Sequence, residues 1–256
     1  MANIHPTAIV DPGAEIGQNV TIGPFAIIEA DTVIGDGSQI ASHVLVASGA
    51  RIGKECIIHK GTVVSTVPQD LKFGNEATTF HIGDRTVIRE FCTLNRGTKD
   101  KWKSVIGSDC LLMAYSHVAH DCTIGNNVIL ANVVQLGGHV TIEDWVILGG
   151  MCAVHQFCHI GQHAIVGGHF RIVQDVPPYI TASSEPLKYA GLNSIGLKRR
   201  GFQPEQISTI KKAYRLLYRS KLNKTHAIER IKTELEQTEE IKNILTFIEN
   251  SQRGLI

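Results

Sequence analysis

The chain has 256 residues, of which 43% are hydrophobic and 19% are charged, and its formal net charge is +1. These values exclude an acidic or basic disordered protein, and 24 glycines with 8 prolines do not fit a collagen-like or low-complexity sequence. No apolar run is long enough to cross a membrane, and the first residues lack the charged and apolar stretches of a signal peptide. We therefore expect a cytoplasmic protein without an integral membrane segment.

A six-residue repeat runs through the first two thirds of the chain. Every sixth residue from Ile4 to Ile172 gives 29 positions, of which 26 hold Ile, Leu or Val, and the exceptions are Asp70, Glu76 and Asp100. In 24 of the 26 aliphatic-led hexads the fifth residue is Ala, Val, Thr, Ser or Cys. Six residues correspond to one short strand and a turn, with one large and one small side chain pointing inward. The repeat therefore predicts a solenoid of stacked short strands.

The repeat resembles that of the hexapeptide-repeat transferases, and this resemblance implies a left-handed parallel β-helix. Three strands would close a triangular coil, and coils would stack about 4.8 Å apart. The left hand is expected from the resemblance alone, because the general crossover preference predicts the right hand. Gly, Asn and Asp after the aliphatic residue are expected to supply the turn conformations. Residues 66–81 and 99–105 are expected to leave the prism as loops, because polar residues take the inward positions there.

All six cysteines occupy the small fifth position of a hexad: Cys56, Cys92, Cys110, Cys122, Cys152 and Cys158. A buried cysteine behaves as a small hydrophobic residue, and the chain has no Cys-x-x-Cys pair of the kind that binds zinc. We therefore expect reduced cysteines in a packed core.

The repeat ends at the Pro177–Pro178 pair, after which the apolar residues take helical spacing. Pro204 suits the first position of a helix, and Asn223 and Thr238 suit the N-caps of two further helices. We expect these helices to form a small domain that covers the open end of the solenoid.

The expected β-helix, residues 1–185, and the expected helical domain, residues 186–256, carry opposite charges. The first has 11 Lys and Arg against 17 Asp and Glu, a net of −6, and the second has 14 against 7, a net of +7. A basic domain attracts an acidic partner or a phosphate, although a solvated helical surface would show the same charges. We do not expect nucleic acid as a partner, because the whole chain is near neutral and no aromatic residues line the basic stretch.

Stacking of coils would bring several histidines and a carboxylate to one edge of the prism. Because residues n and n+18 lie above one another in such coils, His120 stacks on Gly138 and Asp121 stacks on His139. None of these residues occupies an inward position of the repeat, so each is expected to lie at a turn or to point outward.

Two more histidines, His117 and His155, fall on the same edge by the same count. The three that we expect to be ordinary solvated side chains are His159, His163 and His169.

Three interpretations of this histidine cluster are open: a solvated edge, a zinc site and an acid–base site. Some solenoids of this class are zinc hydratases that use three histidines, but carboxylates are few here and zinc-ligand spacing is not evident. A neutral imidazole that acts as a base, beside a carboxylate that fixes its tautomer, fits His120 and Asp121. Gly138 would let a reacting carbonyl approach a backbone N–H.

Longer stretches resemble one family within these transferases, and they are residues 69–72, 117–122, 137–140, 149–157, 174–179 and 196–202. Together they look like the UDP-N-acetylglucosamine acyltransferases, which catalyse the first step of lipid A biosynthesis. The resemblance covers nearly the whole chain. The Gln69-Asp-Leu-Lys loop and the Gly196-Leu-Lys-Arg-Arg-Gly-Phe segment point to this family, whereas the repeats alone point only to the superfamily.

The resemblance implies a homotrimer with active sites between neighbouring prisms. It implies transfer of an (R)-3-hydroxyacyl chain from acyl carrier protein to the glucosamine 3-hydroxyl of UDP-N-acetylglucosamine. His120 would be the general base, Asp121 its orienting partner and the Gly138 N–H the oxyanion donor. The resemblance implies no metal or other bound cofactor, because the phosphopantetheine thioester of the carrier protein brings the acyl group.

The resemblance also implies substrate contacts. The positions that match the sugar, the phosphate or the nucleotide-sugar cleft are Asp70, Lys72, Asn95, His117, His139, His155 and Gln156. Those that match the uridine diphosphate end are Asn193, Arg199 and Arg200, where a guanidinium suits phosphate. Gly168 matches the position that limits acyl length, and a small residue there favours a long chain. Candidates for steering the acidic carrier protein are Lys211, Lys212, Arg215, Arg219 and Lys221.

Two residues depart from the family pattern: Asn95 stands where many members have His, and Ile195 where some have Glu. The sequence leaves four alternatives. A sister enzyme that N-acylates a later sugar nucleotide carries a further domain before its repeats, whereas the hexads here begin at Ile4. The others are an acetyltransferase that uses coenzyme A, a zinc hydratase and a β-helix scaffold without catalytic activity.

Overall fold

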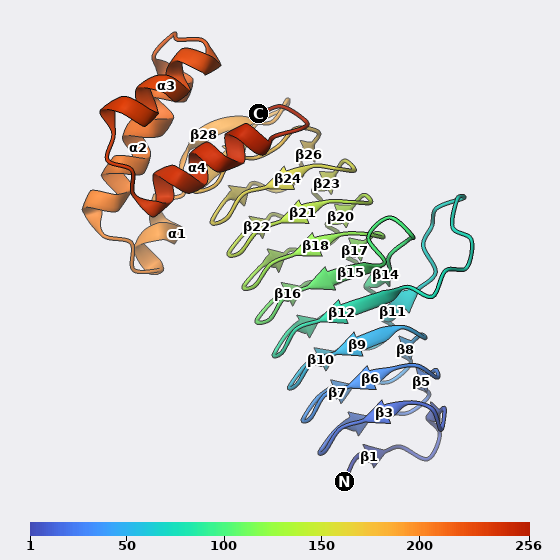
Figure 1. The fold of residues 1–256 in the computed structure, drawn as a ribbon. Coiled ribbons are helices and arrows are strands. Elements are labelled where there is room, and N and C mark those ends of the chain that lie inside the picture. The colour runs from blue at the N-terminus through green and yellow to red at the C-terminus, as the bar shows by residue number, and fades with distance from the viewer.

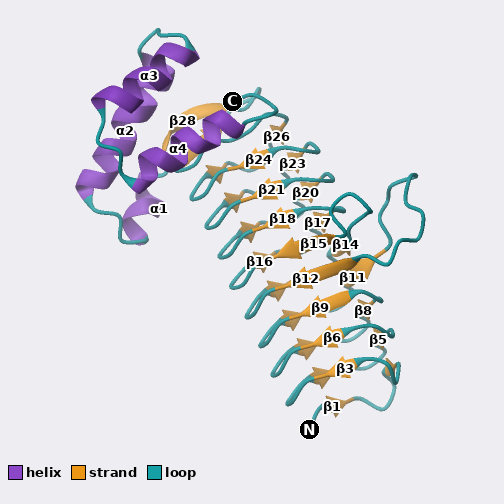
Figure 2. Ribbon diagram, viewed as in Figure 1, coloured by secondary structure: helices purple, strands orange, loops and turns teal.

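The computed structural model describes residues 1–256 as a long triangular prism with four helices at one end (Figures 1 and 2). Three sheets form its faces, and the chain passes from sheet A to sheet B to sheet C in each coil. We name the corners between them edge A–B, edge B–C and edge C–A. Apart from β28, all strands pair in parallel.

The strands of the prism are short and fall into three sets. Sheet A contains β1 (Asn3–Ile4), β4 (Thr21–Ile22), β7 (Gln39–Ile40), β10 (Ile57–Ile58), β13 (Val87–Ile88), β16 (Leu111–Leu112), β19 (Ile129–Leu130), β22 (Ile147–Leu148), β25 (Ile165–Val166), β27 (Ile180–Ser183) and β28 (Lys188–Leu192). Sheet B contains β2 (Ile9–Val10), β5 (Ile27–Ile28), β8 (Leu45–Val46), β11 (Val63–Thr66), β14 (Thr93–Asn95), β17 (His117–Val118), β20 (Gln135–Leu136), β23 (Ala153–Val154) and β26 (Arg171–Ile172). Sheet C contains β3 (Glu15–Ile16), β6 (Val33–Ile34), β9 (Ala50–Ile52), β12 (Thr79–Ile82), β15 (Lys103–Ile106), β18 (Thr123–Ile124), β21 (Thr141–Ile142) and β24 (His159–Ile160).

The register of the strands shows where the chain leaves the prism. Thr21 pairs with Gln39, 18 residues on, as the repeat predicts. Val63 instead pairs with Thr93, 30 residues on, and Thr93 pairs with His117, 24 residues on. The additional residues form two loops, which interrupt the stacking by whole hexads and keep the inward positions in phase.

The two loops are narrower than expected. The long loop, residues 67–78, connects β11 to β12, and the short loop, residues 96–102, connects β14 to β15. Compared with the expected ranges 66–81 and 99–105, residues at the ends of both loops pair with neighbouring coils as strand. Both loops leave at edge B–C, and the Arg96 guanidinium lies 5.7 Å from the ring centroid of Phe73, so the loops contact each other.

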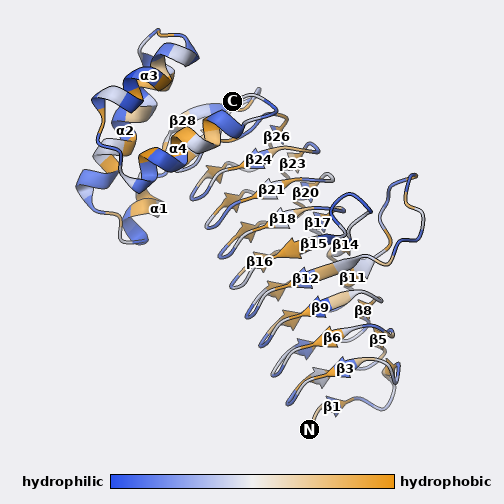
Figure 3. Cartoon of the chain, viewed as in Figure 1, coloured by the Kyte–Doolittle hydropathy of each residue, from blue (hydrophilic) through white to orange (hydrophobic).

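The interior of the prism is filled by the aliphatic and small positions of the repeat, and apolar colour follows the strands in Figure 3. All six cysteines are free and buried, as expected. Their thiols also donate to carbonyl oxygens of the next coil, as Cys110 Sγ does to Gly125 O at 3.2 Å. Burial raises the pKa of Cys110 to about 11, so its thiol is not ionised at neutral pH.

The turns differ from the expected pattern in one respect. Left-handed backbone falls on the fourth residue of the hexad, even where that residue is Trp145 (φ 63°) or Val133 (φ 65°). The glycine after the aliphatic residue serves a different purpose: a Cβ at Gly35 would lie 2.6 Å from the carbonyl carbon of Gly53. Glycine is needed there because neighbouring coils approach closely.

The C-terminal region begins with a strand. Residues Lys188–Leu192 form β28, which pairs with β27 in the antiparallel sense, so the helices start later than residue 186. They are α1 (Ser194–Arg199), α2 (Pro204–Arg219), α3 (Lys224–Glu234) and α4 (Glu239–Asn250). α1 has no expected counterpart.

Three of the four helices begin where the sequence predicts. Pro204 is the first residue of α2, and the Asn223 side chain accepts a hydrogen bond from His226 N at the start of α3. Thr238 precedes α4 without a side-chain cap. The helices cover the last coil, where Tyr214 of α2 donates to Pro178 O at 2.6 Å. None of them combines the length and apolar character needed to span a bilayer.

Candidate active site

The candidate site lies on edge B–C, in the turns that follow β17 and β20. His120 and Asp121 occupy the first turn, and Gly138 and His139 occupy the same turn one coil later. His139 N donates to His120 O at 3.0 Å, which fixes the two turns against each other. The stacking expected from the repeat is therefore present, and both loops leave the prism at the same edge.

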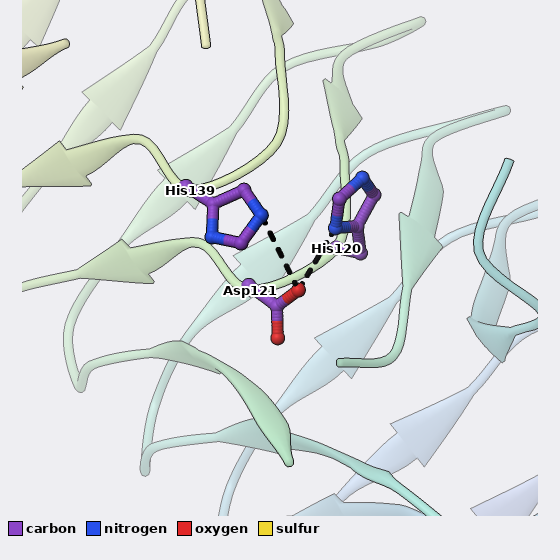
Figure 4. Close-up of side chains that lie close together, drawn as sticks. All are labelled: His120, Asp121 and His139. Atoms are coloured by element: carbon purple, nitrogen blue, oxygen red, sulfur yellow. Dashed lines mark hydrogen bonds and ion pairs between the residues drawn. The ribbon is translucent and has the colours of Figure 1, made fainter. Parts of the chain in front are cut away.

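The carboxylate of Asp121 lies between two imidazole rings (Figure 4). Its Oδ2 is 2.9 Å from His120 Nδ1 and 3.7 Å from His139 Nε2. Because an ionised carboxylate can only accept hydrogen bonds, His120 carries its proton on Nδ1 and Nε2 is left with a lone pair. The His120 side chain is 15% exposed, and its Nε2 has no partner within the chain.

The Asp121 side chain is fully buried but has donors at both oxygens. Thr98 N donates to Oδ1 at 2.9 Å, and the Thr98 hydroxyl donates to Oδ2 at 2.7 Å. Burial by itself would raise the pKa of Asp121, but the hydrogen bonds from His120 and Thr98 outweigh it and lower the pKa. The carboxylate is therefore ionised at neutral pH and can stabilise a charged imidazolium.

Gly138 lies against the ring of His120. A Cβ on Gly138 would be 2.7 Å from both Cε1 and Nε2 of His120, so only glycine leaves room for the imidazole. The Gly138 N–H donates no hydrogen bond within the chain. The site thus pairs a free imidazole nitrogen with a neighbouring unpartnered N–H, the combination that acyl transfer requires.

His139 packs across the site and is held by aromatic contacts. Its ring stacks on Phe157 with centroids 4.5 Å apart and meets His120 edge-on at 5.1 Å. Its Nδ1 is buried without a hydrogen bond, although Asp100 Oδ2 lies 3.2 Å away. The angle there is unsuited to a hydrogen bond, so this contact is an ion pair only when the ring is charged. Burial lowers the pKa of His139, so the ring is neutral at pH 7.

His120, Asp121 and His139 are also the group of potential metal ligands in the structure, with their ligand atoms within 4.8 Å of one another. The donor set fits a metal poorly. Asp121 accepts hydrogen bonds at both oxygens, and the His120 nitrogen closest to it carries the proton of one of these bonds. Coordination would require the carboxylate and the imidazole to give up these partners.

The expected substrate-binding residues on edge B–C differ in their freedom to bind. His155, Gln156 and Lys72 are exposed, and Asp70 Oδ1 accepts from Lys72 N at 2.9 Å. His117 Nδ1 is 2.7 Å from the Thr93 hydroxyl.

Asn95 has a structural role in this chain. It is 3% exposed, and its amide donates to Thr66 Oγ1 at 2.9 Å and Val67 O at 3.1 Å at the base of the long loop. Its donors are thus engaged within the chain.

The remaining expected residues lie on the other two edges. Gly168 follows β25 and is exposed on edge A–B. Asn193 caps α1 by accepting from Gly196 N at 3.1 Å and donates to His163 O at 2.9 Å, which places it at edge C–A. Arg199 is exposed in α1 beside it. One chain does not bring these residues into one pocket with His120.

Comparison with known proteins identifies the family. The model of UDP-N-acetylglucosamine O-acyltransferase domain 2 matches residues 175–256, and the bacterial transferase hexapeptide model matches residues 31–66 and 103–134. An acyl-[acyl-carrier-protein]–UDP-N-acetylglucosamine O-acyltransferase of Chlorobaculum parvum is 54% identical over 99% of this chain and 97% of its own. One of Herminiimonas arsenicoxydans is 45% identical over 100% of both chains. The chain belongs to the UDP-N-acetylglucosamine O-acyltransferase family.

The solved structures of this acyltransferase family agree. The UDP-N-acetylglucosamine acyltransferase of Bacteroides fragilis matches with a TM-score of 0.97 at 43% identity, over 98% of this chain and 99% of its own. That of Acinetobacter baumannii matches with a TM-score of 0.96 at 42% identity, over 99% of each chain. The left-handed parallel β-helix and the C-terminal helices expected from the sequence are confirmed.

Two residues of this acyltransferase were misjudged from the sequence. Thr98 fits the small position of the repeat and gives no sign of its bond to Asp121. His163 was expected to be solvated, but it is 8% exposed and its ring stacks between Trp145 and Tyr179. The signal for His163 was the aromatic residue 18 positions before it, which the stacking rule places on the same corner.

The Arg200 guanidinium is engaged by the same cluster. Its Nη1 donates to His163 Nδ1 at 3.1 Å, and it lies 5.0 Å from the ring centroid of Trp145. Burial, with a smaller contribution from the charge of Arg200, lowers the pKa of His163 to about 4. This histidine is therefore a neutral acceptor that ties α1 to the prism.

We expect the acyltransferase to lose stability as the pH falls from about 6.5 toward 4. The unfolded chain binds a proton at His163 in this range and the folded chain does not, which costs roughly 2 kcal/mol per chain by pH 5. His163→Gln keeps an acceptor for Arg200 and removes the titration. Thermal unfolding at pH 7.5 and pH 5 should show a smaller loss in the variant, and an equal loss in both proteins would contradict this assignment.

Proposed function

We propose that the chain transfers an (R)-3-hydroxyacyl group from acyl carrier protein to the glucosamine 3-hydroxyl of UDP-N-acetylglucosamine, the first step of lipid A biosynthesis. The observation that carries the proposal is the His120–Asp121 pair beside the unpartnered N–H of Gly138. The printed names of its relatives describe acyl transfer from acyl carrier protein to UDP-N-acetylglucosamine. The cytoplasmic location expected from the sequence stays a prediction.

The proposed mechanism uses each member of the site once. His120 Nε2 removes the proton from the sugar hydroxyl as the hydroxyl oxygen attacks the thioester carbonyl. Asp121 stabilises the imidazolium that forms, and the Gly138 N–H donates to the carbonyl oxygen as it gains negative charge. The carbon–sulfur bond then breaks, and the imidazolium returns its proton to the leaving thiolate. A thiol pKa near 8.5 means that the leaving group needs little help.

No bound cofactor is proposed. The acyl group arrives as the phosphopantetheine thioester of the carrier protein, and the hydrogen bonds at both oxygens of Asp121 leave its carboxylate unsuited to holding a metal ion. Turnover that survives prolonged treatment with a chelator is the expected result.

We propose that the active enzyme is a homotrimer with each site between two prisms. Two observations support this: the expected substrate residues occupy three separate edges, and a prism face offers no deep pocket near His120. Along edge A–B runs a ridge of exposed apolar residues in the fourth position of the hexad, namely Phe25, Phe91, Tyr115, Val133 and Met151. Such a ridge indicates a surface that another copy covers.

In the proposed complex, the substrate contacts come from two chains. Asp70, Lys72, His117, His139, His155 and Gln156 of one prism would hold the sugar and the acyl carbonyl. Gly168, Asn193, Arg199 and Arg200 would come from its neighbour and hold the acyl chain and the diphosphate. Because His163 and Trp145 hold Arg200 in the free chain, exposed Arg199 is the more available guanidinium.

The two departures from the family pattern fall on different parts of the proposed substrate. Asn95 is engaged with the long loop, so we propose that it shapes the sugar site through that loop. Ile195 is 70% exposed at the start of α1 and offers no polar contact to the uracil. The long groove left by Gly168 favours a long acyl chain.

The basic domain supports an acidic carrier protein as donor. Lys211, Arg215 and Arg219 line one side of a depression of about 640 Å³, with Tyr189 and Ser194 on the other side. The other candidate residues for steering are Lys212 and Lys221, on the same helix and just after it. Positive charge gathered around a depression attracts a negatively charged protein at long range.

We expect added salt to weaken the carrier interaction. Raising ionic strength from about 0.01 M to 1 M shortens the Debye length from about 30 Å to 3 Å, and KM for the acylated carrier should rise several-fold. Arg215→Gln with Arg219→Gln should raise this KM at low salt and flatten its salt dependence, whereas exposed Lys60→Gln, on the prism, should match the parent. A KM unaffected by salt would remove the electrostatic account.

A thiol-release assay tests the proposed function. The purified chain is mixed with (R)-3-hydroxyacyl carrier proteins of several chain lengths, and free thiol is followed with and without UDP-N-acetylglucosamine. Release that requires the sugar nucleotide and is fastest for a long chain is the expected result. Release only with the 3-amino analogue of the sugar would overturn the hydroxyl as acceptor, and no release from a folded trimer would overturn the reaction itself.

A further inference from the structure

The short loop reaches the catalytic carboxylate through one residue. Thr98 donates its N–H to Asp121 Oδ1 at 2.9 Å and its hydroxyl proton to Oδ2 at 2.7 Å. Lys101 N is 3.3 Å from Oδ1. Oδ2 is the oxygen that also receives His120 Nδ1, so the Thr98 hydroxyl and the imidazole share one acceptor atom.

The direction of the Thr98 hydroxyl is unusual for its place in the repeat. Thr86 and Ser38 occupy the same small position, and their hydroxyls donate to carbonyl oxygens of the next coil, Gly107 O at 2.8 Å and Gly53 O at 2.9 Å. Those bonds hold the coils together. Thr98 is 7% exposed and would suit the same use, but its proton goes to a carboxylate.

A second hydrogen bond fixes the hydroxyl in this orientation. Asp100 N donates to Thr98 Oγ1 at 3.2 Å, so the oxygen accepts from the short loop while its proton is directed to Asp121. The loop therefore contributes a chain of polar contacts that ends on the His120–Asp121 pair. This chain has no counterpart in coils that stack without a loop.

We propose that Thr98 is a positioning residue that sets the orientation and basicity of His120 through Asp121. The proposal rests on the proposed function in so far as His120 is the base. The Thr98 hydroxyl withdraws charge from Oδ2, so the carboxylate holds the Nδ1 proton of His120 without stabilising the imidazolium excessively. The two donors from Thr98 also lock the carboxylate plane, which keeps the His120 ring over Gly138.

Removal of the hydroxyl should have two separate effects. Oδ2 carries more negative charge in Thr98→Val, so the imidazolium is better stabilised and the protonation midpoint of the His120 ring moves to higher pH. The acidic limb of the kcat profile moves in the same direction, because the base must be neutral to act. The looser carboxylate should lower kcat about tenfold, the size expected for one hydrogen bond to a charged group, while KM for UDP-N-acetylglucosamine changes less than about twofold.

The direct test is a histidine NMR titration of the folded protein labelled with ¹⁵N-histidine. The His120 signal is assigned by its loss in His120→Gln, and its midpoint is compared between the parent, Thr98→Val, Thr98→Ser and Thr86→Val. We expect an upward shift in Thr98→Val, a value close to the parent in Thr98→Ser, and none in Thr86→Val, which loses a buried threonine hydroxyl elsewhere. If Thr98→Val does not fold, Thr98→Ala removes the hydroxyl with less bulk and takes its place.

The outcomes separate this inference from the proposed reaction. The NMR midpoint requires no substrate, so a shift in Thr98→Val supports the role of Thr98 even if no acyl transfer is detected. A midpoint and a pH profile of Thr98→Val that equal those of Thr86→Val would overturn the inference and leave Thr98 as part of the framework. A loss of activity that Thr98→Ser does not restore would overturn it equally.

Discussion

His120→Ala is expected to leave the folded trimer intact and to lower kcat by about 10²- to 10⁴-fold, the range found for a positioned general base. The residue lies at a turn on the surface of the prism, and without it Asp121 keeps its donors from Thr98. The loss therefore reflects chemistry rather than folding. Steady-state rates with saturating substrates, with light scattering for the mass of the trimer, measure both.

The matched control is His5→Ala, which removes an exposed imidazole from the first coil, where it contacts Thr7. Its kcat should equal that of the parent. A His120→Ala trimer that turns over at the parent rate would show that another group takes the proton.

Gly138→Ala is expected to reduce kcat nearly as much as the loss of His120. The added Cβ would lie 2.7 Å from Nε2 of His120, far inside the contact distance, so the ring must turn away from the reacting hydroxyl. Gly138 does not adopt a left-handed backbone, so alanine causes no strain of its own. Stability should change little, because the imidazole has room to move outward.

Gly13→Ala provides the comparison, since its Cβ would meet only the Asp11 carboxylate at 3.3 Å and the Ala30 side chain at 3.5 Å. We expect parent activity there. The displacement account is tested by a crystal structure of the Gly138→Ala protein, and an inactive variant whose His120 ring has not moved would contradict it. That result would leave the lost approach of the oxyanion as the cause.

The repeat made the fold predictable because each six-residue unit specifies its own strand, turn and inward side chains. Coil stacking then placed His120, Asp121, Gly138 and His139 together without any tertiary information. The ends of the loops and strand β28 were harder, since pairing with a neighbouring coil extends strands into residues that the repeat does not mark. α1 is held by Asn193 and by its contacts with the last coils rather than by a periodic apolar pattern.

The polar contacts of the site were less predictable than its position. Thr98 satisfies the rule for a small inward residue, and only the coordinates show its hydroxyl on Asp121. Asn95 was expected to contact substrate, whereas in this chain its amide anchors the long loop. Side-chain direction depends on local loop geometry, which a periodic pattern does not encode.

The most direct test of the account is the mass and linkage of the product. The purified protein is incubated with UDP-N-acetylglucosamine and a long-chain (R)-3-hydroxyacyl carrier protein, and the sugar nucleotide is analysed by mass spectrometry before and after mild alkali. The account predicts one added hydroxyacyl group that alkali removes, as an ester at the glucosamine 3-hydroxyl does. An unmodified sugar nucleotide, or an alkali-stable amide, would contradict it.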